Sequence, residues 1–129
     1  MIAVMRSVMC DLMPRSPGLP GLADTDVTGF LRAMRRESGR LYWLALSLGA
    51  WVYALTPVLT VYVPLPSFLL PARLRARHAE RVTLLRTYVL RQAVQLVRLS
   101  AGMCWGADPN VRARFALAPY PPDPGSFRG

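Results

Sequence analysis

A run of 32 residues without a charged side chain, residues 41–72, constrains the fold of this 129-residue chain more than any other feature. Arg40 and Arg73 border the run. Its first 23 residues, 41–63, would make a helix of about 34 Å, which is long enough to cross a bilayer. A segment this apolar has to be covered by the rest of the chain, by a membrane or by a partner protein.

Two interpretations of residues 41–63 stay open. Pro57 divides the segment, and Trp51 and Tyr53 would lie in the middle of a span, although aromatic residues favour its ends. The alternative is a buried helix over residues 40–55 that ends near Pro57, followed by an extended connection at 64–68 that packs on a partner. The flanking arginines give no orientation in a membrane, because four lie at similar distance on each side.

The basic character of the chain comes from arginine alone, since 16 basic residues face 7 acidic ones and no lysine is present. Binding to nucleic acid is the least favoured function, because the arginines are interleaved with aliphatic residues. Anionic lipid headgroups or an acidic protein surface suit them better. We expect that role for Arg35, Arg36, Arg40, Trp43, Trp51, Arg73 and Arg77.

The Arg35-Arg36 pair precedes the apolar run in the manner of a twin-arginine export signal. Four residues separate the pair from the run, and the pair lies far from the first residue. We therefore interpret it as a pair on a helix surface.

The first 28 residues are predicted to be a flexible leader. Proline and glycine are dense over residues 14–21, which disfavours helix and strand alike. Arg6 and Asp11 interrupt the apolar start, so it is too short for a signal peptide. A helix capped by Asp26 or Thr28 then opens a helical domain over residues 29–106, which contains the apolar segment 41–70.

A long amphipathic helix is predicted over residues 72–104, behind Pro71. Apolar residues recur there at steps of three and four, and the internal core is expected from Leu85, Val89, Leu96, Leu99 and Met103. A second apolar arc lies on another side of this helix, and a chain of this size can hardly cover both arcs. We therefore expect a partner protein on the second arc, at Leu90, Val94 and Val97.

The predicted fold class is all-α, with two or three helices and extended proline-rich tails. Residues 107–129 are expected to form a short helical turn and then a polyproline-like tail. The size of the chain fits one domain.

No catalytic set is present in the sequence. His78 is the only histidine, and Glu80 falls on a different side of the helix, so neither a metal site nor a catalytic dyad is indicated. Cys10 and Cys104 lie outside any C-x-x-C spacing and are expected to be packed thiols. Because no glycine-rich loop joins a strand to a helix, we expect no cofactor in this chain.

Three segments carry a resemblance to a known family. They are F-L-L-P at residues 68–71 with the arginine-rich segment 73–81, the long helix over 84–103, and W-G-A-D-P-N-V-R-A at 105–113. Residues 30–120 resemble the small helical subunit, or N-terminal helical extension, of membrane-associated flavoprotein dehydrogenases of the glucose-methanol-choline class. The gluconate 2-dehydrogenase small-subunit family belongs to this group.

The resemblance implies a non-catalytic accessory subunit that packs on a large FAD-bearing dehydrogenase subunit, which would hold the only cofactor. The complex would be associated with a membrane of bacterial type. Besides Leu90, Val94 and Val97, the accessory chain would contact its partner through Trp105, Asp108, Pro109, Val111, Arg112 and Tyr120. The alternative from the apolar run is a small membrane protein with one span, acting as an anchor or assembly factor.

Overall fold

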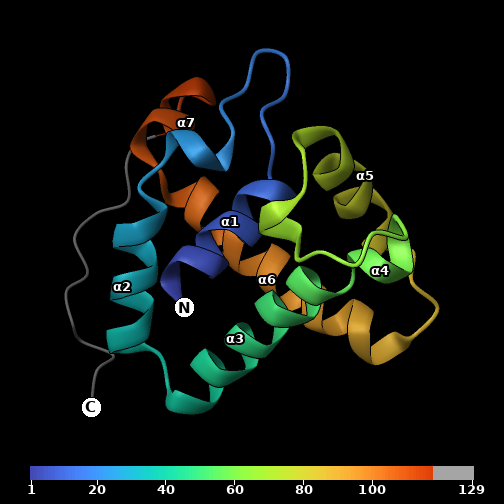
Figure 1. The fold of residues 1–129 in the computed structure, drawn as a ribbon. Helices are drawn as coiled ribbons and strands as arrows, with labels where there is room; N and C mark the ends of the chain where they lie inside the picture. The colour runs from blue at the N-terminus through green and yellow to red at the C-terminus, as the bar shows by residue number, and fades with distance from the viewer. Residues whose placement is uncertain (118–129) are drawn as a thin grey trace.

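The computed structural model describes residues 1–117, and this part of the chain is all-α (Figure 1). Its helices are α1 (Ile2–Leu12), α2 (Val27–Glu37), α3 (Arg40–Leu55), α4 (Pro57–Thr60), α5 (Ala72–Val82), α6 (Tyr88–Ala107) and α7 (Pro109–Arg114). Two short 3-10 turns, η1 (Leu22–Asp24) and η2 (Ser67–Leu69), lie between them. The predicted fold class is confirmed for these residues, but the expected count of two or three helices was too low.

Helices α1, α3 and α6 build the core. Tyr42, near the start of α3, hydrogen-bonds Ser100 of α6 at 2.8 Å, and Gly49 further along α3 lies against Ala93, so the two helices run in opposite directions. Each of the three helices contributes fully buried apolar side chains to one cluster. The members include Met5, Val8, Met9, Leu46, Ala50, Tyr53, Val94, Val97 and Ala101.

The predicted flexible leader was wrong for residues 2–12, which form α1 (blue in Figure 1). Four buried residues of α1 are three or four positions apart and therefore lie on one side of the helix: Met5, Val8, Met9 and Leu12. Arg6 and Asp11 lie outside this stripe. They interrupt the apolar run in the sequence but leave the apolar side of the helix intact. Helix α1 is therefore part of the helical core.

The predicted long helix over 72–104 is two helices, because α5 ends at Val82 and α6 begins at Tyr88. The Thr83 hydroxyl donates a hydrogen bond to the Glu80 carbonyl at 2.9 Å, which satisfies a carbonyl at the end of α5. Neither glycine nor proline marks this break in the sequence.

The two apolar arcs of α6 were assigned the wrong way round. Val94 and Val97, predicted to face a partner, are buried in the core, and Leu90 is half-buried. Exposed fractions reach 71% at Val89 and 58% at Leu99 and Met103, three of the residues predicted as core. Leu85 and Leu96 are half-buried at the edge of the cluster.

The segment 41–63 is not one helix. Helix α3 spans 16 residues and ends before Pro57, and Tyr62 after α4 has a positive φ of 59°. Within residues 1–117 no helix combines the length and the apolar character needed to cross a bilayer.

Helices α3 and α6 approach most closely at Gly49. A Cβ atom at this position would lie 2.4 Å from the carbonyl oxygen of Ala93 and 2.8 Å from Cγ2 of Val97. Backbone lines one side of this contact, so it cannot be relieved by a side-chain rotation alone. Any residue larger than glycine would push the two helices apart.

We predict that Gly49→Ala lowers the free energy of unfolding by about 1–3 kcal/mol, the usual cost of overpacking. Gly102→Ala in α6 is the matched control, because a Cβ there meets no atom within 4 Å. That control should be stabilised by up to about 1 kcal/mol through better helix propensity. Urea unfolding measures both changes, and equal stability of the two variants would contradict the close approach.

Candidate functional site

Large apolar side chains are exposed along the whole charge-free segment. Five come from α3, and six come from α4 and the connection to α5. We call these eleven side chains the α3–α4 face: Leu41, Leu44, Leu48, Trp51, Leu55, Val58, Leu59, Tyr62, Leu65, Phe68 and Leu69.

The α3 part of this face is a continuous stripe. Its residues follow one another at steps of three and four, on the side of α3 opposite the buried Leu46 and Ala50. The exposed fraction is 80% at Leu41 and 57% at Leu48. A helix that is apolar on all sides is normally covered on all sides, but no part of residues 1–117 covers this side of α3. Exposed apolar patches of this kind mark binding surfaces.

The partner-facing residues predicted near the end of α6 are engaged inside the chain. Trp105 donates its indole N–H to the Pro20 carbonyl at 2.9 Å, and its ring meets the edge of Phe115 with 5.9 Å between centroids. These contacts attach the segment before η1 to the last turn of α6.

Asp108 is the N-cap of α7. Its carboxylate accepts hydrogen bonds from the backbone N–H groups of Asn110 and Val111, at 2.9 and 3.2 Å. Val111 is buried, Arg112 is half-buried and Pro109 is exposed. Tyr120, the last residue of that predicted set, lies outside the described residues.

The predicted basic and aromatic set is mostly at the surface. Arg35, Arg36, Arg40, Arg73 and Arg77 are exposed, and Trp51 is part of the α3–α4 face. Trp43 differs, because it is half-buried and packs against the core. The Arg35-Arg36 pair lies in the last turn of α2, where positive charge interacts favourably with the helix dipole.

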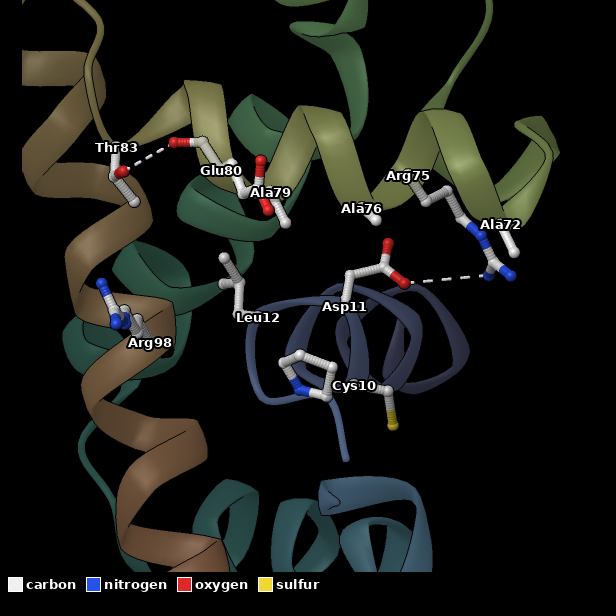
Figure 2. A pocket seen from close by; sticks show the side chains of 11 residues that line it. Cys10, Asp11, Leu12, Ala72, Arg75, Ala76, Ala79, Glu80, Thr83 and Arg98 are labelled. Atoms are coloured by element: carbon white, nitrogen blue, oxygen red, sulfur yellow. Dashed lines mark hydrogen bonds and ion pairs between the residues drawn. The ribbon is translucent and has the colours of Figure 1, made fainter. Parts of the chain in front are cut away.

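A cleft of about 540 Å³ lies between α1, α5 and α6 (Figure 2). We call it the α1–α5 cleft. Its walls are the end of α1 with Pro14, one side of α5 with Thr83, and Arg98 of α6. The α5 wall presents Ala72, Ala76 and Ala79, whose small side chains leave the space open.

Charged groups meet on one side of this cleft. The Asp11 carboxylate lies 3.7 Å from Nη1 of Arg75 and accepts a hydrogen bond of 3.3 Å from the Tyr53 hydroxyl. Burial raises the pKa of Asp11, and the charge of Arg75 offsets that rise only in part. Nε of Arg75 is buried without a hydrogen-bond acceptor. Among the described residues, Glu80 and Arg98 form no ion pair.

Both cysteines are reduced thiols in protected places. Cys10 is half-buried beside the α1–α5 cleft, and Cys104 is buried next to the Thr25 hydroxyl. Burial raises the pKa of each thiol, so the thiolate needed for nucleophilic chemistry is disfavoured. Residues 1–117 bring no three His, Cys, Asp or Glu side chains together in a way that could hold a metal ion.

His78 is buried and joins three elements. Its Nε2 donates to the Tyr53 carbonyl at 2.7 Å, so Nδ1 carries no proton in the neutral ring and accepts from the Thr60 hydroxyl at 2.6 Å. The His78 and Tyr53 rings are 4.4 Å apart between centroids. These contacts fasten α5 to the end of α3 and to α4.

We predict that the free energy of unfolding declines as the pH falls below about 6.5, because burial lowers the pKa of His78 from that ordinary value. The unfolded chain then binds a proton that the folded chain resists, at a cost of at most about 1.4 kcal/mol per pH unit. Above about pH 6.5 the His78 ring is neutral in both the folded and the unfolded chain, so its full contribution to stability is present. The chain has one histidine, so the difference between wild type and His78→Gln in urea unfolding from pH 6.5 to about 5 isolates its contribution, because the raised pKa of Asp11 acts on both proteins alike. His78→Gln should be less stable and lack this part of the decline, and parallel profiles of the two proteins would contradict a buried neutral ring.

No protein-family model, no curated protein and no solved structure matches this chain. Its function therefore has to be inferred from the α3–α4 face and the α1–α5 cleft.

Proposed function

We propose that this chain is a non-catalytic helical accessory subunit that binds a larger protein through the α3–α4 face. One observation carries the proposal: eleven large apolar side chains are exposed in a segment that has no charged residue. Covering apolar surface contributes about 25 cal/mol for each Å² removed from water, so a partner with a complementary apolar surface would bind there.

The composition of the face favours a protein as its cover. Obligate protein interfaces resemble a domain core cut in half, with charge depleted at the centre and polar residues at the rim. The α3–α4 face has this arrangement along the sequence, because Arg40 and Arg73 flank its charge-free segment. Trp51, Tyr62 and Phe68 supply the aromatic side chains that often anchor such interfaces.

The resemblance of residues 30–120 to small subunits of flavoprotein dehydrogenases names the class of partner that we propose. This partner is a large FAD-dependent oxidoreductase subunit, which would bind the flavin and perform the chemistry. The accessory chain would stabilise it by covering an apolar surface. An all-α fold and an uncovered apolar helix face are compatible with such a role.

A peripheral membrane protein is the second candidate. Trp51 and Tyr62 are exposed within the α3–α4 face, and aromatic rings favour the headgroup region of a bilayer. The exposed arginines at positions 35, 36, 40, 73 and 77 would attract anionic lipids. In this arrangement the face would rest at the membrane surface, and the chain would tether its complex there.

We predict that tagged wild-type chain, purified from the cells that make it, retains a larger protein with the visible absorbance of a bound flavin. Leu48→Arg should reduce the recovery of that protein by about a hundredfold, since an unpaired charge would be buried in the interface. Leu84→Arg is the matched control, because Leu84 is 78% exposed and lies outside the face. It should leave recovery unchanged.

Each other outcome excludes part of the proposal. Equal recovery with both variants would exclude the α3–α4 face as the docking surface. A retained partner without flavin would overturn the oxidoreductase assignment and leave the face in place. Sedimentation of the chain alone with phosphatidylglycerol vesicles, lost in Leu48→Arg, would select the membrane candidate instead.

A further inference from the structure

The α1–α5 cleft is separate from the α3–α4 face and has the dimensions of a ligand site. Its volume of about 540 Å³ falls within the range of roughly 300–1,000 Å³ that small-molecule pockets occupy. Ala72, Ala76 and Ala79 line it from one side of α5 at steps of four and three residues. Larger side chains at these positions would close the space, so the alanines are the local reason that it exists.

Arg75 has hydrogen-bonding capacity that the chain does not use. Its 3.7 Å contact with Asp11 is longer than the roughly 2.7–2.9 Å of a charge-assisted hydrogen bond. Nε is buried without an acceptor and is therefore out of a ligand's reach, but the side chain as a whole is 36% exposed, so a ligand can reach other parts of it. A guanidinium in this state can accept an additional anionic partner in the planar geometry that carboxylates offer.

Arg98 is the second cation of the cleft. Figure 2 shows it across Leu12 from the Asp11–Arg75 pair. It forms no ion pair with another described residue. Leu12, Ala76 and Ala79 provide an apolar wall between the two guanidinium groups. The cleft thus combines two guanidinium groups with an apolar wall between them.

Two carboxylates also line the cleft, and neither cancels this preference. Asp11 is already engaged with Arg75 and Tyr53, and burial disfavours its charged form. Glu80 and Arg98 are both exposed, so water screens the charge of each to a similar degree. The group with the greatest unused capacity is the Arg75 guanidinium.

We propose that the α1–α5 cleft binds a small organic carboxylate with an aliphatic body. Arg75 receives the carboxylate, Leu12 and the α5 alanines contact the body, and Arg98 adds a second positive charge. Asp11 opposes binding through its negative charge, so its removal strengthens the site. This inference does not depend on the proposed docking role of the α3–α4 face.

Isothermal titration calorimetry of the full chain with octanoate tests the proposal, with 1-octanol as the uncharged probe of equal length. We expect saturable octanoate binding that is at least about tenfold tighter than octanol binding, the effect of one charge-assisted contact. Arg75→Gln should weaken octanoate binding by about tenfold or more. Asp11→Asn should strengthen it, because the amide oxygen can still accept from Tyr53 while the repulsive charge is gone.

Three further variants make the test decisive. Ala76→Leu fills the cleft and should abolish binding, and Arg98→Gln should weaken it without breaking an ion pair of the described chain. Arg86→Gln, at an exposed arginine outside the cleft, should change nothing. Circular dichroism checks that each variant is folded.

Several results would overturn the inference. Equal affinity for octanol and octanoate would exclude recognition of a carboxylate. Octanoate binding that is unchanged in Ala76→Leu and Arg98→Gln and is lost in Leu48→Arg would place the aliphatic chain on the α3–α4 face. Absence of saturable octanoate binding to the folded wild-type chain would exclude the site. None of these results bears on the recovery of a partner protein, which tests the proposed function separately.

Discussion

The close contact between α3 and α6 at Gly49 decides which side of α3 is covered. Because glycine lets the backbone of α6 approach, α3 packs one side against α6 and α1, and none of the elements described in residues 1–117 covers the opposite side. Leu41, Leu44 and Leu48 face outward as a direct consequence. The α3–α4 face is therefore a product of core packing, since α3 supplies both the buried and the exposed apolar surface.

A buried polar network positions the other half of the molecule. His78 links α5 to the Tyr53 carbonyl and to Thr60, and Arg81 donates to the Thr60 carbonyl at 2.7 Å. These bonds hold α5 at the end of α3, on the side where it also meets α1. The short alanine side chains of α5 then leave the α1–α5 cleft open between the two helices. Packing at Gly49 and hydrogen bonding at His78 together define the two surfaces on which the functional inferences rest.

Much of the helical content could be predicted from local sequence signals. Asp26 caps α2 through the Gly29 N–H at 3.0 Å, as expected for this residue type before a helix. Helix α3 covers residues 40–55 and stops before Pro57, as the buried-helix alternative required. These signals are local, and each depends on one residue type at one position.

Features that depend on tertiary contacts could not be predicted in the same way. The break after α5 involves a Thr83 hydroxyl bond and no glycine or proline. Both arcs of α6 are apolar, and the arc that packs inside is the one that meets Gly49 of α3 at the Ala93 carbonyl and the Val97 side chain. For that reason the expected partner arc at Val94 and Val97 is core, and the uncovered surface lies on α3 instead. The α1–α5 cleft joins residues far apart in sequence and left no motif that a reading of the chain could find.

Hydroxyl-radical footprinting with mass spectrometry tests the central claim most directly, because it measures side-chain accessibility in the unmodified chain. We expect rapid oxidation of Leu44, Leu48 and Trp51 in the isolated chain and strong protection of all three in the complex purified from its own cells. Tyr88, which is 66% exposed and outside the face, should be oxidised equally in both samples. Slow oxidation of the three residues in the isolated chain, or the same rapid oxidation in the complex, would contradict the assignment of the α3–α4 face as the docking surface.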